Sequence, residues 1–250
     1  SSAFGTDSKM YDSSFGWRFV NSKLDAIYGT EGMGETAENL VEKYNISRED
    51  QDTFALRSQQ KAAAAQESGR LVREIVSVEI KQRKGDPYFF HKDEFIKPGT
   101  TLEGLSKLRG AFKKDGSVTA GNASGLNDGA CATIIASEEA VKKYNLKPMA
   151  RIVSSAVVGV EPRIMGIGPV EATKKALAKA NLTLDQIDII ELNEAFASQS
   201  IACLRELGLK DDDKRVNPNG GAIAIGHPLG VTGARIAYSA ALELQLTGKR

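Results

Sequence analysis

Cysteine is scarce in this sequence, and charge of one sign is not in excess. The 250 residues contain only Cys131 and Cys203. Because each lies in an apolar stretch, the pair suits reduced, buried thiols better than a disulfide framework or a metal site, and we expect no metal. Lys and Arg number 33 against 32 Asp and Glu. Since no net field gathers a polyanion over such a surface, nucleic acid is not expected as a partner.

Long hydrophobic runs are missing as well. No apolar run approaches the roughly 20 residues of a membrane-spanning helix, and the first residues lack the basic and apolar regions of a signal peptide. We therefore expect no membrane partner and a cytoplasmic location. Hydrophobic residues still make up 41% of the chain, which is enough for a real core. The sequence starts without methionine and stops just after a predicted helix, so we expect both ends to be cuts in a longer chain.

The part up to about residue 110 combines short helices with polar loops. Apolar residues at helical spacing predict a helix over residues 35–44. Ser47, with Asp50 three residues later, predicts a capping arrangement that opens a second helix, which should end near Gly69. Alternating polarity over residues 76–80, followed by a Gly-Asp-Pro turn, predicts a β-hairpin.

From residue 130 onward the pattern changes to alternating strands and helices. Apolar runs predict buried strands over residues 131–136, 152–158 and 188–192, with a short one near Val216. Helices are predicted over residues 137–144, 170–180, 193–207 and 233–246. This alternation is typical of an α/β fold.

The most informative segment is the glycine-rich stretch at residues 217–230. Glycines at this density allow close backbone approach and unusual backbone angles. His227 precedes Pro228, which holds it out of helical geometry and fixes the direction of the imidazole. A histidine on a rigid loop suits a general base or a donor to an oxyanion. A core histidine bonded to backbone is the alternative, and the residues alone leave both open.

Two further segments could contribute to a site. Residues 191–197 stand between a predicted strand and a predicted helix, where ligand sites of α/β sheets lie. Asn193 could instead cap the helix, and Glu194 could simply favour the positive end of its dipole. Residues 119–130 are small and polar, so their backbone could lie against a narrow ligand or form a turn-rich connector.

Nucleotide motifs fail on spacing. The pair Gly221 and Gly226 is followed by His-Pro where a Walker motif needs Lys and Ser or Thr. The pair Gly166 and Gly168 reaches Glu171 where a dinucleotide fingerprint needs glycine.

Three motifs in this order resemble the thiolase family, and the resemblance covers the entire chain. They are Thr-Ala-Gly-Asn-Ala-Ser-Gly at residues 119–125, Asn-Glu-Ala-Phe at 193–196 and Gly-Gly-Ala-Ile-Ala-Ile-Gly-His-Pro at 220–228. The resemblance implies the thiolase fold, an α/β architecture layered α-β-α-β-α with an inserted loop domain, of which this chain covers only part. It implies a loop domain at residues 1–126, the closing strand and helix of the N-terminal half at 127–147, and the C-terminal half, lacking its end, at 148–250.

The resemblance also implies a reaction. A thiolase is an acyltransferase that cleaves a 3-ketoacyl-CoA with a second CoA, or condenses in reverse, through an acyl group held on cysteine. By this resemblance His227 takes the nucleophile's proton and donates to the thioester oxygen, while Asn193 holds a water that completes the oxyanion site. CoA and acyl-CoA are then substrates, with no permanently bound cofactor, and the protein forms a homodimer or homotetramer.

Pocket residues follow from the same resemblance. Around the pantetheine arm and the acyl group it places Met33, Phe112, Ala120, Ser124, Met165 and Phe196. The two methionines could equally be core residues, which is their commoner use. Ser124 has a physical reason of its own, because a small hydroxyl beside glycine can bond a pantetheine amide without blocking it.

The cysteines set this chain apart from the family pattern. Cys131 and Cys203 match non-catalytic positions, so we expect the 250-residue chain to be inactive by itself. One alternative is a non-catalytic, thiolase-like fragment for CoA binding or assembly. Another is a ketoacyl synthase of the same fold, against which the paired Asn-Glu-Ala-Phe and Gly-His-Pro motifs argue.

Residues 10–21 and 35–39 resemble the corresponding segments of β-ketoadipyl-CoA thiolases. This implies cleavage of 3-oxoadipyl-CoA to succinyl-CoA and acetyl-CoA. Gly32 agrees, because thiolases specialised for acetoacetyl-CoA often carry histidine at that place. A dicarboxylic acyl group would need a cation at its far end, which Arg18 or Arg163 could supply as a bidentate partner. Plain surface solvation is the alternative for either arginine.

Overall fold

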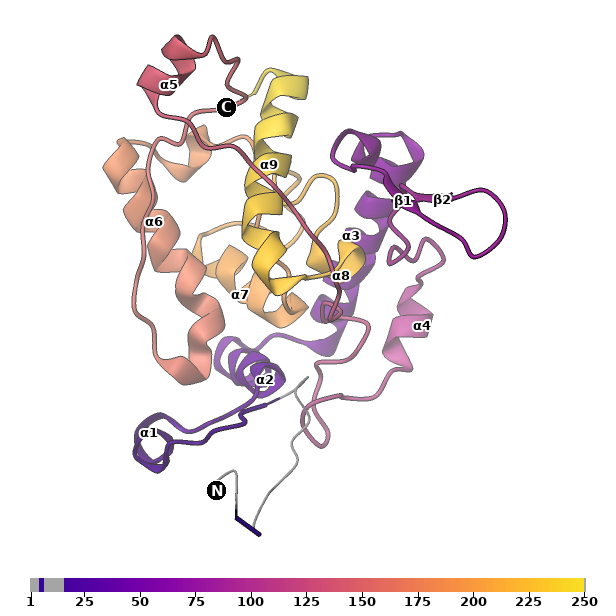
Figure 1. Ribbon diagram of the computed structural model, residues 1–250. Helices are drawn as coiled ribbons and strands as arrows, with labels where there is room; N and C mark the ends of the chain where they lie inside the picture. Colours follow the sequence, from indigo (N-terminus) through magenta and orange to yellow (C-terminus); the bar gives the residue numbers. More distant parts are fainter. Residues whose placement is uncertain (1–4, 7–15, 250) are drawn as a thin grey trace.

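Helices are the main regular elements of the structure, a computed structural model that describes residues 5–6 and 16–249 (Figure 1). In chain order the α-helices are α1 (Ser22–Tyr28), α2 (Met33–Tyr44), α3 (Arg48–Glu67), α4 (Leu102–Ser106), α5 (Glu138–Lys143), α6 (Gly168–Ala180), α7 (Ala197–Glu206), α8 (Ala222–Ile225) and α9 (Leu229–Thr247). Short 3₁₀ helices are η1 (Leu71–Arg73), η2 (Pro162–Ile167) and η3 (Leu184–Gln186), and the strands are β1 (Val78–Ile80) and β2 (Tyr88–Phe90). The sequence segment at residues 10–15, which carried part of the substrate prediction, lies outside the described residues.

The N-terminal elements confirm their sequence signals. The backbone N–H of Asp50 bonds Ser47 Oγ at 3.0 Å, and the Ser47 N–H bonds the Asp50 carboxylate at 3.3 Å, so the predicted capping box opens α3. That helix ends at Glu67, close to the predicted end near Gly69. The hairpin forms as predicted, with Val78 opposite Phe90 and Ile80 opposite Tyr88. In Figure 1 it projects from the body of the molecule.

The core lies where α3 meets α7 and α8. Phe54 and Ala55 of α3 pack in one cluster with Ile201 and Leu204 of α7, all of them buried. Full burial of such side chains contributes about 1.5–3 kcal/mol each. This cluster packs α3 against α7. The short helix α8 of the glycine-rich segment adds Ile223 to the same core.

The predicted strands at residues 131–136 and 152–158 are neither paired nor buried. Within the described part of the chain both run extended without a ladder partner, with Ile134 92% exposed and Val157 85% exposed. Residues 152–158 lie along α6 instead, where Ser154 Oγ donates to the carbonyl of Ala176 at 2.8 Å (Figure 1). An apolar run becomes a strand only where a neighbouring strand satisfies its backbone, and these residues have no such neighbour here.

The other predicted strands are reduced to a single parallel bridge between Ile190 and Val216. The neighbouring side chain of Asn217 prolongs it, accepting from the Leu192 N–H and donating to the Leu192 carbonyl, both at 2.8 Å. This bridge brings the segment before Asn193 beside the segment before the glycine-rich loop.

Two helices begin four residues away from their predicted starts. Helix α7 begins at Ala197 and not at 193, because Phe196 is extended (φ −142°, ψ 145°) and bridges Ala123. Helix α9 begins at Leu229 and not at 233, directly after Pro228, whose ring presets the backbone at the helix start.

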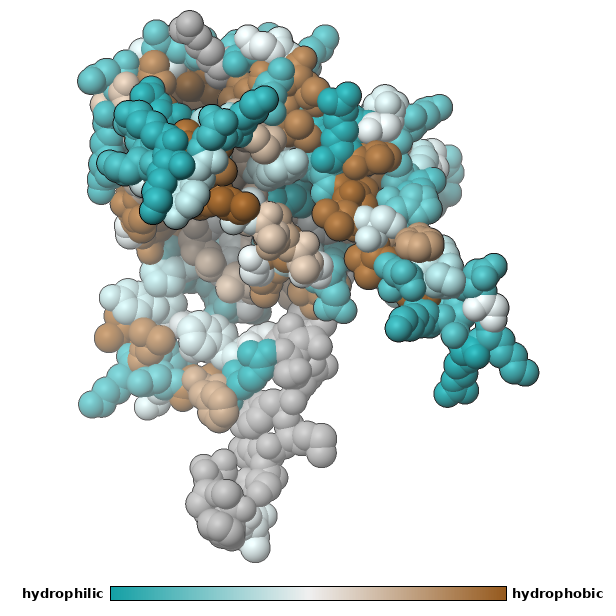
Figure 2. Space-filling model, turned by 45° about the horizontal axis from the view of Figure 1, so that its top comes forward, coloured by the Kyte–Doolittle hydropathy of each residue, from teal (hydrophilic) through white to brown (hydrophobic). Residues whose placement is uncertain are grey.

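The surface carries apolar patches among hydrophilic side chains, as the face in Figure 2 shows. Cys203 is buried and free, as predicted. Cys131 is free but exposed, so the prediction that it is buried was wrong, because the segment at 131–136 is unpaired. Over the described residues, no helix is both long and apolar enough to cross a membrane.

Candidate active site

The imidazole ring of His227 is oriented by a hydrogen bond at Nδ1. Its Nδ1 lies 2.7 Å from Thr232 Oγ1, and that hydroxyl donates to the Pro228 carbonyl at 3.1 Å. Because the hydroxyl proton is used there, we assign the proton between the two side chains to Nδ1, which leaves a lone pair on Nε2. Burial, with a smaller contribution from the charge of Arg235, lowers the pKa of His227 below its ordinary value. The ring is therefore neutral at neutral pH, and Nε2 carries the lone pair that can accept a proton.

The backbone before His227 explains the glycine there. Gly226 has φ 97°, and a Cβ at this position would come within 2.5 Å of Asn127 Oδ1. The same Asn127 oxygen accepts from the His227 N–H at 3.3 Å. A side chain at 226 would break this contact and turn the imidazole.

Asn193 faces His227. Its Nδ2 lies 3.3 Å from His227 Nε2, and its Oδ1 is buried without a partner among the described residues. The predicted alternative, a helix cap, is wrong, because α7 begins four residues later. The amide thus stands beside the imidazole with one acceptor unused, and a buried acceptor of that kind calls for a hydrogen bond from water or ligand.

Glu194 binds this segment to the glycine-rich loop. Its carboxylate accepts from Ser58 Oγ at 2.5 Å, from Asn217 Nδ2 at 2.8 Å and from the Ile223 N–H at 3.2 Å. Burial raises its pKa, while these hydrogen bonds oppose the shift. A Cβ on Gly221 would lie 2.2 Å from the carboxyl carbon, which is why that position is glycine.

The role of Glu194 differs from its prediction. It was expected to favour the dipole of a helix, yet it precedes the first turn of α7 and is 2% exposed. Its hydrogen bonds join the segment that carries Asn193 to the glycine-rich segment that carries His227. Its partner Ser58 lies 136 residues away in sequence.

A cavity of about 780 Å³ joins most of the predicted site. Five of the eight predicted residues line it: Met33, Met165, Asn193, Phe196 and His227. The two methionines come from the start of α2 and from η2, so the cavity runs from the histidine loop to the space between these two elements. Its lining is mostly apolar, as small-molecule sites usually are.

Phe112, Ser124 and Ala120 do not line this cavity. Phe112 packs edge-on against Phe196, with ring centroids 5.8 Å apart, and so supports the wall from behind. The Ser124 N–H donates to the Ala195 carbonyl at 3.0 Å, which places it beside the Asn193 segment. Ala120 is exposed on a turn.

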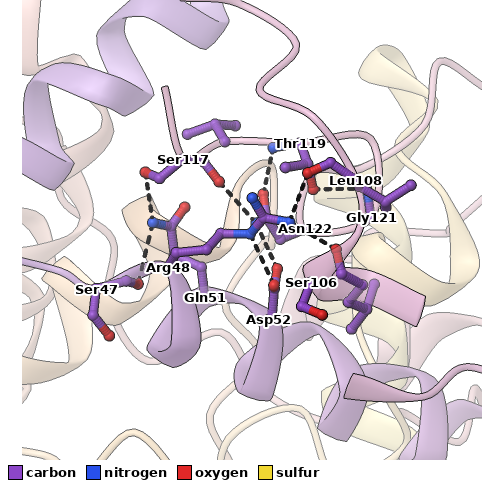
Figure 3. Close-up of polar contacts among 12 residues, drawn as sticks. Ser47, Arg48, Gln51, Asp52, Ser106, Leu108, Ser117, Thr119, Gly121 and Asn122 are labelled. Atoms are coloured by element: carbon purple, nitrogen blue, oxygen red, sulfur yellow. Dashed lines mark hydrogen bonds and ion pairs between the residues drawn. The ribbon is translucent and has the colours of Figure 1, made fainter. Parts of the chain in front are cut away.

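The segment before Ser124 is fixed by a polar network on α3 (Figure 3). Asn122, which is fully buried, donates to Asp52 at 2.9 Å and to the Ser117 carbonyl at 3.1 Å, and it accepts from the Thr119 N–H at 2.8 Å. Arg48 binds the same Asp52 at 2.8 Å. This segment is more than a loose connector, because its one buried amide satisfies three partners.

Glu191 is a further titratable group of the cavity wall. Burial raises the pKa of its carboxyl to about 8, against the opposing charge of Arg235. Two nitrogens of Arg235, Nε and Nη2, are buried without a partner among the described residues. At neutral pH, Glu191 is therefore mostly protonated beside an unpaired cation.

Neither cysteine reaches the cavity wall. Cys203 lies in α7, donates to the Gly166 carbonyl at 3.2 Å, and burial raises the pKa of its thiol to about 11. A buried thiol of this kind is inert. Among the described residues, no group of three His, Cys, Asp or Glu side chains is arranged to hold a metal ion.

Arg163 is already paired. Its guanidinium forms a bidentate ion pair with Glu31, with Nη2 to Oε1 at 2.7 Å and Nε to Oε2 at 3.0 Å. Arg163 was predicted as a possible partner of the substrate's distal carboxylate. In the structure the Glu31 carboxylate already occupies that side of the guanidinium. Arg18 lies exposed.

The geometry defines a class: an apolar cavity that ends at a neutral histidine and an amide, suited to acyl transfer. Comparison with known proteins agrees. The N-terminal domain of thiolase matches residues 6–139, and the C-terminal domain of thiolase matches residues 146–250. The chain belongs to the thiolase family and has the thiolase fold.

Two relatives are similar to almost the whole of this chain. A β-ketoadipyl-CoA thiolase of Acinetobacter baylyi is 59% identical over 98% of this chain, and a 3-oxoadipyl-CoA/3-oxo-5,6-dehydrosuberyl-CoA thiolase of Escherichia coli is 56% identical over 97%. In both, the match spans 61% of the relative's length.

Solved structures agree on the fold. An acetyl-CoA acetyltransferase of Bacillus anthracis superposes with a TM-score of 0.87 at 44% identity, over 99% of this chain and 61% of that one. A human mitochondrial 3-ketoacyl-CoA thiolase in complex with CoA gives 0.82 at 52% identity, over 87% of this chain and 53% of that one. The α/β thiolase fold expected from the motifs is thus confirmed. Among the described residues, however, 131–136 and 152–158 form no strand, and the strands predicted at 188–192 and near Val216 are reduced to one bridge.

Proposed function

We propose that this chain supplies the base and the oxyanion site of a thiolase that cleaves 3-oxoadipyl-CoA. The observation that carries the proposal is the pairing of His227 Nε2 with Asn193 at 3.3 Å, at the end of a cavity open to a long, narrow substrate. The names of the relatives, the β-ketoadipyl-like segments and Gly32 support the substrate.

In the proposed reaction, His227 Nε2 takes the proton of a cysteine thiol, because it carries the lone pair of the ring while the proton on Nδ1 is fixed on Thr232. The thiolate attacks the 3-keto carbon. The bond between carbons 2 and 3 breaks, carbon 2 takes a proton from the thiol of a second cysteine, which the family resemblance implies and which also lies outside these 250 residues, and acetyl-CoA leaves. The second cysteine recovers its proton from the thiol of a second CoA, and the resulting thiolate attacks the acyl-cysteine and releases succinyl-CoA. The nucleophilic cysteine then recovers its own proton from His227.

Charge develops on the carbonyl oxygen in both halves of the reaction. The imidazolium formed on His227 donates to that oxygen through Nε2. A water held by the unpaired Asn193 Oδ1 supplies a second donor. Two preorganised donors in a partly buried site lower the barrier by several kcal/mol.

The cysteine in this scheme comes from outside the 250 residues. Cys203 is held by Gly166 and its thiol is hard to ionise, while Cys131 is exposed. The chain spans about 61% of the length of the relatives, so a part that they have and this chain does not is the natural source. CoA thioesters are substrates here, no cofactor is permanently bound, and the assembly is a homodimer or homotetramer.

The test is an assay of two proteins. One is this chain, and the other is a joined protein, in which the chain is fused to the part of the A. baylyi relative that the match does not cover. We expect CoA-dependent cleavage of 3-oxoadipyl-CoA by the joined protein only, and a drop in kcat/KM of about 10³-fold in its His227→Ala variant. A joined protein that binds CoA but cleaves no 3-ketoacyl-CoA would favour the non-catalytic alternative.

A further inference from the structure

A second polar assembly lies beside Met33 and Met165, which line the cavity. Glu31 precedes α2 and Arg163 belongs to η2, and their bidentate pair joins segments 132 residues apart. Hydrogen bonding to Arg163 lowers the pKa of Glu31, which keeps the carboxylate charged at neutral pH. Two parallel hydrogen bonds fix an orientation as well as a distance.

Asn39 on α2 locks the pair in place. Its amide donates to Glu31 Oε2 at 3.0 Å and to the Arg163 carbonyl at 2.9 Å. Both amide protons are therefore used, one on each partner. The three residues form a closed set, which we call the rim clamp: Glu31, Asn39 and Arg163.

The rim clamp lies next to both methionines of the cavity wall. Met33 follows Glu31 by two residues and starts α2, and Met165 follows Arg163 by two residues within η2. Both line the cavity together with Thr36 of α2. Met33 and Met165 are 61% and 46% exposed, so packing alone holds neither side chain firmly.

From this geometry we infer that the rim clamp is a positioning device, which sets the spacing of Met33 and Met165 and so the width of the cavity at its acyl end. The identity of the substrate in this inference rests on the proposed function. The effect of the rim clamp on the two methionines rests on the contacts alone. Arg163 acts through Glu31 and does not receive the substrate's distal carboxylate.

The charges decide between these two roles. A receptor arginine needs a free fork, whereas the fork of Arg163 holds Glu31 with Nε and Nη2. If substrate displaced Glu31, that carboxylate would stay beside the incoming one and repel it. A clamp that remains closed avoids this conflict.

Methionine methyl groups report on the mechanics directly. The sequence has four methionines, so ¹³C-methyl labelling of the chain gives a spectrum that single Met→Leu variants can assign. We expect Glu31→Gln and Arg163→Leu to shift the signals of Met33 and Met165 and to leave that of Met149, whose carbonyl accepts from Gln245 near the end of α9, in place. Glu138→Gln, which breaks the exposed pair with Lys142, is the matched control and should move neither cavity signal. Unchanged cavity signals in both clamp variants would overturn the inference.

Kinetics of the joined protein separates clamp from receptor. With a closed clamp, Glu31→Gln and Arg163→Leu raise KM about threefold to tenfold for 3-oxoadipyl-CoA and for unbranched 3-oxohexanoyl-CoA alike, with kcat nearly unchanged, because an exposed ion pair has a modest effect. The double variant should be no worse than either single one. If Arg163 were the receptor, Glu31→Gln would lower KM for the dicarboxylic substrate alone, and that result would reject the clamp. An inactive joined protein would reject the proposed function, while the methyl spectra still decide the mechanics.

Discussion

The two ends of the cavity are held by contacts of opposite kind. At the His227 end, Glu194 is 2% exposed and joins three partners in the interior. At the methionine end, the side chain of Arg163 is 56% exposed, and the rim clamp faces solvent. Breaking a buried charged network leaves partners unpaired out of water, whereas breaking an exposed pair returns them to water. In the proposed function, the chemistry therefore lies at the buried end of the cavity, and the acyl group lies at the end whose contacts are exposed.

The largest effect should come from Glu194→Ala. This change leaves the Asn217 amide, the Ser58 hydroxyl and the Ile223 N–H without their common acceptor. We expect the free energy of unfolding of the chain to fall by about 3–5 kcal/mol, measured by urea denaturation. Glu194→Gln keeps an acceptor and should lose less. Equal stability of all three proteins would show that the buried end of the cavity does not depend on this carboxylate.

Glu191 makes the buried end of the cavity sensitive to pH. Its folded-state pKa of about 8 lies above the ordinary value of 4.5, so its contribution is fully present below about pH 4.5 and is lost as the pH rises toward 8. Between these values the free energy of unfolding should fall by up to about 1.4 kcal/mol per pH unit. Glu191→Gln should flatten this slope, with Glu138→Gln as the control at an exposed site. A slope that survives in Glu191→Gln belongs to another group.

A smaller effect is expected from Thr232→Val, which removes the partner of His227 Nδ1 and keeps the shape. Both tautomers of the ring then become accessible, so kcat of the joined protein should drop about tenfold. The free energy of unfolding should change much less than in Glu194→Ala. Unchanged kcat would mean that the rest of the loop suffices to orient the imidazole.

Sequence patterns predicted the features whose causes are local. The capping box at Ser47 and the hairpin at Val78 rest on neighbours a few residues away, and both form. His227 and Asn193 were singled out through their motifs, and the structure places their side chains 3.3 Å apart, while their catalytic roles stay a prediction. The function of Glu194 was missed because Ser58, 136 residues earlier, carries no signal that connects them.

Other features depend on contacts that no local pattern records. The apolar run at residues 131–136 predicts burial, but burial needs a neighbouring strand, and Ile134 is 92% exposed in the described structure. The pairing of Arg163 with Glu31 was not predicted, because no local pattern in the sequence connects the two residues. The charge pattern gives the sign of a side chain and leaves its partner undetermined.

In the proposed reaction His227 activates a cysteine supplied from outside these 250 residues. Intact-protein mass spectrometry of the joined protein, mixed briefly with 3-oxoadipyl-CoA in the absence of free CoA, detects this step. We expect a gain of one succinyl group on a cysteine of the added part, formed quickly with His227 present and about 10³-fold more slowly in His227→Ala. An acyl group on Cys131 or Cys203, or equal rates of acylation in the two proteins, would contradict it.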